Sequence, residues 1–84
     1  MSKKITIYTT DYCPYCVKAK ALLIRKNTAF EEIKIVNNEM RDAMITKSGG
    51  RRTVPQIFIG DLHVGGCDEL YELDRQKKLD ELLK

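Results

Sequence analysis

The chain has 84 residues, the length of one small domain, and we expect residues 1–84 to fold as a single domain. Its formal net charge of +3, from 15 lysines and arginines against 12 acidic residues, is too small and too scattered to indicate nucleic-acid binding. No stretch is apolar for long enough to cross a membrane, and we expect no export signal. Three cysteines is an odd number for a disulfide-stapled secreted domain, so a reducing, cytoplasmic setting is expected.

The hydrophobic pattern predicts elements in the order β-α-β-α-β-β-α. In chain order these are a strand over 5–9, a helix over 14–26, a strand over 30–36, a helix from Asn37 or Asn38 to Gly49-Gly50, strands over 56–59 and 62–64, and a helical region from Asp68 onward. The first half is a βαβ unit, which implies two parallel strands with a right-handed crossover, and the second half adds a hairpin and a helix. We therefore predict an α/β fold with a four-stranded mixed sheet and helices on both faces.

The most informative motif is Cys13-Pro14-Tyr15-Cys16, between a predicted strand and a predicted helix. A thiol at a helix N-terminus loses its proton more easily because the backbone N–H groups there carry partial positive charge. Pro14 suits the first helical position, where its missing N–H has no partner to lose. The spacing places both cysteines on the first turn, as a reversible dithiol requires, although two buried structural thiols are the alternative interpretation. A Cys-x-x-Cys pair beside a βαβ pattern is typical of a thioredoxin-like redox fold.

Two further segments have both a functional and a plain structural interpretation. Thr53-Val54-Pro55 is predicted to be extended, because a proline disfavours helical geometry in the residue before it; an ordinary strand-entry proline explains it equally. Gly65-Gly66-Cys67-Asp68 is a turn that leads into a helix, where backbone N–H groups can hold a carboxylate. A simple N-cap role explains Asp68 as well.

These three motifs, in this order and at this spacing, make the chain resemble the glutaredoxin family, and within it the small bacterial dithiol kind. The likeness also runs through 19–23 and 55–59, so it covers essentially the whole chain. It implies a thioredoxin-like fold and a glutathione-dependent thiol–disulfide oxidoreductase that acts on glutathione mixed disulfides and protein disulfides. Glutathione would be a reducing co-substrate, with no tightly bound cofactor and no metal. Ribonucleotide reductase is a candidate electron acceptor, and with no long exposed apolar stripe the chain is expected to be a monomer.

The resemblance also assigns roles. Cys13 would be the nucleophile and Cys16 the resolving thiol. The glutathione-binding residues would be Tyr15, Thr53, Val54, Pro55, Gly66, Cys67 and Asp68. Among them, Val54 would pair through its main chain next to a cis proline, the backbone N–H groups of the Gly-Cys-Asp turn would hold the γ-glutamyl carboxylate, and the Asp68 side chain would hold the amino group. Tyr15 has partial packing on a neighbouring loop as its alternative. Cys67 is expected to be partly buried and used through its backbone, with a reactive third thiol as the minority interpretation.

The chain departs from the family at Thr10, where many members carry Lys or Arg three residues before the first cysteine, and Asp11 adds a carboxylate that opposes thiolate formation. We expect weaker glutathione binding or less thiolate at Cys13 than in relatives with that cation. Lys18, Arg51 and Arg52 are candidate substitutes.

Three other functions each fit part of the sequence. A zinc module would use Cys13, Cys16, His63 and Cys67, which are residue types that zinc binds. Two features oppose a zinc site. A regular amphipathic helix follows Cys16, and His63 is expected to lie on the strand face opposite Leu62 and Val64. An iron–sulfur carrier of this family typically has one active-site cysteine followed by Gly-Phe-Ser, unlike Pro14-Tyr15-Cys16. A redoxin served by thioredoxin reductase usually lacks Tyr15 and the Gly-Gly-Cys-Asp turn.

Overall fold

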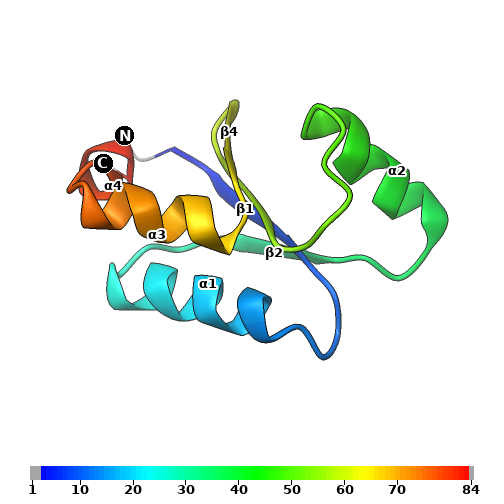
Figure 1. Cartoon of the computed structure of the whole chain (residues 1–84), viewed down its shortest axis with the longest axis horizontal. Coiled ribbons are helices and arrows are strands. Elements are labelled where there is room, and N and C mark those ends of the chain that lie inside the picture. The colour runs from blue at the N-terminus through cyan, green and yellow to red at the C-terminus, as the bar shows by residue number, and fades with distance from the viewer. Residues whose placement is uncertain (1–2, 84) are drawn as a thin grey trace.

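The computed structural model describes residues 3–83. Its strands and helices alternate in the first half of the chain and end with two helices (Figure 1). In chain order they are β1 (Ile5–Thr9), α1 (Pro14–Arg25), β2 (Glu31–Lys34), α2 (Asn38–Lys47), β3 (Gln56–Ile59), β4 (Leu62–Gly65), α3 (Cys67–Arg75) and α4 (Leu79–Leu83).

The four strands form one mixed sheet in the order β2-β1-β3-β4. β1 pairs parallel with β2, as the predicted βαβ unit requires, and antiparallel with β3, which forms a hairpin with β4. Residues 60 and 61 make the hairpin turn, in which Gly60 has φ of 59°. The predicted four-stranded mixed α/β sheet is confirmed.

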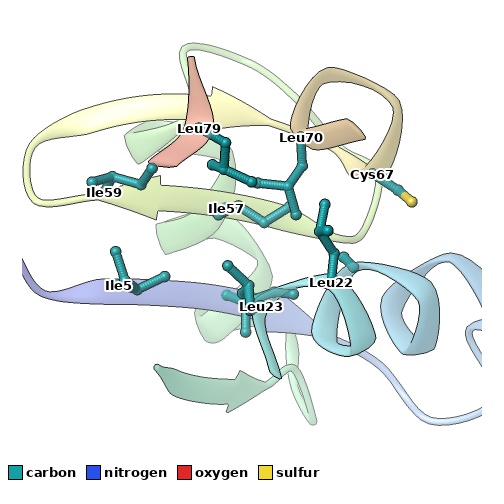
Figure 2. Packing of buried hydrophobic residues seen from close by; sticks show 10 residues of the cluster. Ile5, Leu22, Leu23, Ile57, Ile59, Cys67, Leu70 and Leu79 are labelled. Carbon is teal, nitrogen blue, oxygen red and sulfur yellow. The ribbon is translucent and has the colours of Figure 1, made fainter. Parts of the chain in front are cut away.

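Each face of the sheet carries its own core, because alternate residues of a strand point to opposite faces. On one face, α1, α3 and α4 cover Ile5, Ile7, Ile57 and Ile59, with Leu22, Leu23, Leu70 and Leu79 from the helices (Figure 2). On the other face, Met44 of α2 packs with Tyr8 and Phe58. Helices therefore lie on both faces, as predicted, and α2 stands apart from the pair α1 and α3 (Figure 1).

Two helix boundaries differ from the prediction. The last helical region is two helices, because Lys77 adopts a left-handed conformation with φ of 62° and ends α3. The N-cap of α3 is Gly66, so the alternative interpretation of Asp68 as a simple N-cap is wrong: its carboxylate lies in the first turn instead. The second helix begins as predicted, with Asn37 as N-cap accepting a hydrogen bond from Met40 N at 2.9 Å.

The strand register brings distant segments to one edge of the sheet. β1 ends beside the start of β3, with Tyr8 opposite Gln56, and Gly65 at the end of β4 lies opposite Ile57. The starts of α1 and α3 and the loop before β3 therefore meet at the carboxyl end of β1. The Tyr71 hydroxyl donates to Lys18 O at 2.9 Å and joins the two helices near this edge. Within residues 3–83, none of the helices has the length and apolarity to span a bilayer.

Candidate active site

Cys13 is the N-cap of α1, with extended backbone geometry at φ −111° and ψ 101°. Its Sγ accepts a hydrogen bond from Cys16 N at 3.1 Å, and Pro14 occupies the first helical turn as predicted. A sulfur in this position faces the positive end of the helix dipole and a free N–H group, both of which stabilise a thiolate. Cys13 is half-buried, so a disulfide can still reach it.

Cys16 has the opposite environment, with 2% of its surface exposed. Burial, followed by hydrogen bonding to Cys13, raises the pKa of the Cys16 thiol to about 12. Both cysteines are free thiols here. A half-buried sulfur at a helix N-terminus and a fully buried, protonated sulfur behind it form an asymmetric pair. This arrangement suits attack by the first sulfur and later attack by the second.

The loop before β3 lies against the first cysteine. The Val54–Pro55 peptide bond is cis, as the family resemblance implied. Cys13 Sγ is 3.9 Å from the carbonyl oxygen of Val54. The main chain of Val54 is therefore adjacent to the reactive sulfur, where it can pair with the backbone of a cysteine-containing ligand.

A groove of about 270 Å³ passes this point. It is lined by Tyr15, Arg51, Thr53, Val54, Pro55, Gly66, Cys67, Asp68 and Glu69. All seven residues that the family resemblance assigned as ligand contacts are among them. A larger cavity of about 590 Å³, between Lys3–Ile5 and Asn27–Glu31, contains none of the cysteines.

The start of α3 supplies the polar end of the groove. Glu69 Oε1 accepts a hydrogen bond from Gly66 N at 2.6 Å, so this N–H is already occupied. The N–H groups of Cys67 and Asp68 belong to the first turn and have no acceptor within the helix. Those two N–H groups are therefore the ones in this turn that stay available to an acceptor from outside the helix. The absence of a side chain at Gly66 lets α3 start close to Pro55, because a Cβ at this position would lie only 3.3 Å from Pro55 O.

Sequence reasoning missed Glu69 as a groove residue. Its carboxylate also accepts from Arg51 Nη2 at 3.2 Å, so it joins the two walls of the groove. The bond from Gly66 N, with Arg51 as a further cause, lowers the pKa of Glu69. The signal was present in the sequence, because a Glu three residues after an N-cap is a capping-box pattern.

Cys67 has 5% of its surface exposed, and burial raises the pKa of its thiol. Its sulfur projects from the margin of the hydrophobic core (Figure 2). Low exposure and a disfavoured thiolate support the expected role through the backbone and weigh against a reactive third thiol.

A buried amide supports the loop before β3. Gln56 is fully buried, and its Nε2 donates to Thr53 O at 2.9 Å and contacts Thr53 Oγ1 at 3.3 Å. Its Oε1 lies 2.7 Å from His63 Nε2, and burial lowers the pKa of His63. His63 thus belongs to a structural network. Among residues 3–83, no group of three or more His, Cys, Asp or Glu side chains is arranged to hold a metal ion.

Thr10 and Asp11, the two residues at which the chain differs from many family members, lie in the loop just before Cys13. Asp11 forms an ion pair with Lys34, with Oδ1 and Nζ 3.1 Å apart, so its negative charge is partly offset by a cation on β2. Thr10 is half-buried and lines a cavity together with Cys13. A longer, charged residue at position 10 would stand close to the first cysteine.

The glutaredoxin family model matches residues 5–64, which include the Cys-x-x-Cys pair and the cis proline. The chain belongs to the glutaredoxin family. It is 56% identical over 82 residues to Glutaredoxin 1 of Rickettsia typhi, covering 95% of this chain and 79% of that protein. Glutaredoxin 3 of Escherichia coli is 51% identical over 80 residues, covering 95% of this chain and 96% of that protein.

The structural comparison agrees. The crystal structure of a buckwheat glutaredoxin–glutathione complex superposes with a TM-score of 0.87 at 30% identity, covering 96% of this chain and 76% of that one. The expected thioredoxin-like fold and glutaredoxin membership are confirmed. Family, fold and the paired cysteines together make this protein a thiol–disulfide oxidoreductase.

Proposed function

We propose that the protein is a glutathione-dependent oxidoreductase that reduces glutathione mixed disulfides and protein disulfides. One observation carries the proposal: Cys13 Sγ lies at the N-cap of α1 and 3.9 Å from Val54 O, beside a groove lined by every predicted glutathione contact. The complex of the buckwheat relative with glutathione supports the same ligand for this groove.

The first exchange takes place at Cys13. Its thiolate attacks the glutathione sulfur of a mixed disulfide, so that a Cys13–glutathione bond forms and the partner leaves as a thiolate that takes up a proton. A second glutathione thiolate then attacks the sulfur of the bound glutathione. Glutathione disulfide leaves and the Cys13 thiolate is restored. This path uses one cysteine.

Protein disulfides take the second path. After Cys13 has formed a mixed disulfide with the substrate protein, the Cys16 thiolate attacks the Cys13 sulfur. The substrate protein then leaves as a thiolate and takes up a proton. A Cys13–Cys16 disulfide forms, and two electrons have passed to the substrate. Two glutathione molecules then reduce it. The 3.1 Å bond from Cys16 N to Cys13 Sγ places the two residues on one turn, as ring closure requires.

The groove offers a partner for each part of glutathione. The Val54 main chain would pair with its cysteinyl unit, and the N–H groups of Cys67 and Asp68 would hold the γ-glutamyl carboxylate at the positive end of α3. The Asp68 carboxylate would hold the amino group. The remaining contacts would come from Tyr15, which is 59% exposed, and from Thr53, Pro55 and Gly66.

We also propose the partners, the compartment and the oligomeric state of the protein. Glutathionylated and disulfide-containing proteins are the expected partners, with ribonucleotide reductase as a candidate electron acceptor. We expect the protein to be a single-domain monomer and to work in the cytoplasm, where a reducing environment keeps thiols free.

Turnover with a small glutathione mixed disulfide, glutathione, glutathione reductase and NADPH tests the proposal. Cys13→Ser should abolish turnover, whereas Cys16→Ser should retain it and lose only protein-disulfide reduction. Activity in Cys13→Ser, or none in the wild type, would overturn the proposal.

A further inference from the structure

A second cavity lies beside the two active-site cysteines. It has a volume of about 480 Å³ and shares no residue with the groove described above. Its walls come from the β1–α1 loop, the first turns of α1 and strand β2. The residues are Thr10, Asp11, Tyr12, Cys13, Pro14, Cys16, Val17, Lys20, Glu32 and Lys34. Both active-site cysteines therefore line a space that also holds two lysine–carboxylate pairs.

Lys20 lies four residues beyond Cys16 and so on the same face of α1, whereas Lys18, two residues beyond it, does not line this cavity. Its Nζ lies 3.0 Å from Glu32 Oε2, and both side chains are only 27% exposed. The same oxygen accepts a hydrogen bond from Thr9 Oγ1 at 2.7 Å, and Thr9 is 1% exposed. Two neighbouring strands thus fix the position of the ammonium group instead of leaving it free in water.

The charged and titratable groups around Cys16 act in opposite directions. Burial and the Cys13 sulfur raise the pKa of Cys16, through a hydrogen bond and through charge, whereas a backbone hydrogen bond with Thr10 and the charge of Lys20 lower it. The other titratable groups that face the cavity are Asp11, Tyr12, Glu32 and Lys34. Asp11 and Lys34 are paired with each other at 3.1 Å, as Lys20 is with Glu32. Of the two lysines in the cavity, Lys20 is the one whose charge lowers the pKa of Cys16.

We propose that Lys20, fixed by Glu32 and Thr9, is a positioning residue for the resolving step, and that its ammonium group favours the Cys16 thiolate that attacks Cys13. The proposal rests on the function proposed above and adds the group that makes a buried thiol usable as a nucleophile. The proton of Cys16 passes to solvent. The thiolate then forms the Cys13–Cys16 bond while the bond from Cys13 to the substrate sulfur breaks.

The same arrangement gives the two thiols an order. While Cys13 is a free thiolate, its charge and its hydrogen bond oppose a second thiolate at Cys16. Once Cys13 is in a mixed disulfide, that charge is gone and the effect of Lys20 remains. Cys16 is thus held back until there is a bond for it to attack.

The test measures ring closure directly. Protein carrying glutathione on Cys13 is prepared, and the release of glutathione by Cys16 is followed in a single turnover across a range of pH. A loss of about one pKa unit of thiolate stabilisation corresponds to about tenfold. Lys20→Met should therefore slow release near neutral pH by up to about this factor and displace the pH profile upward. Lys20→Arg should restore most of the rate, and Arg25→Met, an exposed cation at the far end of α1, is the matched control.

A second measurement is independent of glutathione chemistry. In a Cys13→Ser, Cys67→Ser background, alkylation of the one remaining thiol by iodoacetamide reports the thiolate fraction of Cys16. Lys20→Met should lower this rate and Lys20→Arg should not. The double variant Lys20→Met, Glu32→Gln, which also removes the remaining carboxylate charge, should fall between Lys20→Met and the wild type.

The outcomes separate the two proposals. Slower alkylation in Lys20→Met together with a wild type that cannot turn over glutathione mixed disulfides would overturn the proposed function and keep the role of Lys20. Unchanged pH profiles in Lys20→Met, or equal losses in Lys20→Met and Lys20→Arg, would overturn the role of Lys20. Urea unfolding of each variant confirms that it is folded before the rates are compared.

Discussion

The Glu69 carboxylate and the Arg51 guanidinium close one side of the active-site groove, with Oε1 and Nη2 3.2 Å apart. The same oxygen accepts the Gly66 N–H at 2.6 Å, so one carboxylate serves both as a helix cap and as a bridge to the loop before β3. The ion pair with Arg51 depends on the ionised form of Glu69, and the hydrogen bond from Gly66 N is strengthened by it. The groove is consequently held together by a residue that need not touch the ligand.

Removing this carboxylate should weaken both the helix start and the groove. We expect Glu69→Ala to lower the free energy of unfolding by about 1 kcal/mol, the usual cost of a lost cap, and to raise the KM for a glutathione mixed disulfide. Glu69→Gln should have a stability and a KM between those of the wild type and Glu69→Ala, because its amide oxygen can still accept from Gly66 N. Asp42→Ala, at an exposed position of α2, is the control for loss of an acidic side chain. A KM equal to that of the wild type in Glu69→Ala would show that the bridge does not shape the groove.

The buried amide of Gln56 should matter more for stability. Gln56→Leu removes the hydrogen bonds that the fully buried Gln56 amide makes to the exposed Thr53 and the half-buried His63. We expect a loss of about 2 kcal/mol in urea unfolding, together with a higher KM because Thr53 lines the groove. Gln76→Leu, an exposed glutamine that bonds to Glu72, should change stability by less than about 0.5 kcal/mol. Equal effects of the two substitutions would contradict this.

Glu32 should make stability depend on pH. The hydrogen bond from Thr9, then that from Lys20, lowers its pKa from the ordinary value of 4.5. A carboxylate whose pKa is lower in the folded state adds stability above its unfolded-state pKa and loses it as the pH falls through the folded-state value. We expect Glu32→Gln to cost about 1–2 kcal/mol at neutral pH and progressively less below about pH 4. A difference between wild type and variant that is constant with pH would be inconsistent with an ionised Glu32.

Restoring the cation that many relatives carry should strengthen glutathione binding. Thr10 lines the cavity next to Cys13, so Thr10→Lys would place an ammonium group within reach of a glutathione carboxylate or of the Cys13 thiolate. A partly exposed ion pair of about 0.5–1 kcal/mol corresponds to a two- to fivefold lower KM. Thr10→Met controls for side-chain length, and identical KM values for the two variants would dismiss the idea.

Much of the site could be predicted because its signals are local. Pro14 at the start of a helix, a proline after Val54 and glycines before Cys67 each restrict the backbone within a few residues. The βαβ order and the hairpin then bring these segments to one edge of the sheet. The family resemblance supplied the individual glutathione contacts, which backbone restriction alone left open.

The remainder depends on contacts between distant elements. The ion pair of Lys20 and Glu32 joins α1 to β2, and the sequence around each residue does not indicate which residue it will contact. The break at Lys77 lacked a cue, since the left-handed conformation there is adopted without a glycine or proline. A capping role for Asp68 was one of two interpretations, because a capping aspartate and a first-turn aspartate look alike in sequence. In the structure the helix begins one residue before Asp68, with Gly66 as its N-cap.

The central claim is that Cys13 is the sulfur that carries glutathione. The most direct measurement is to treat the Cys16→Ser protein with glutathione disulfide and to map the adduct by peptide mass spectrometry. We predict one glutathione per chain, on Cys13, removed by excess glutathione. An adduct confined to Cys67, or no adduct at Cys13, would contradict the account.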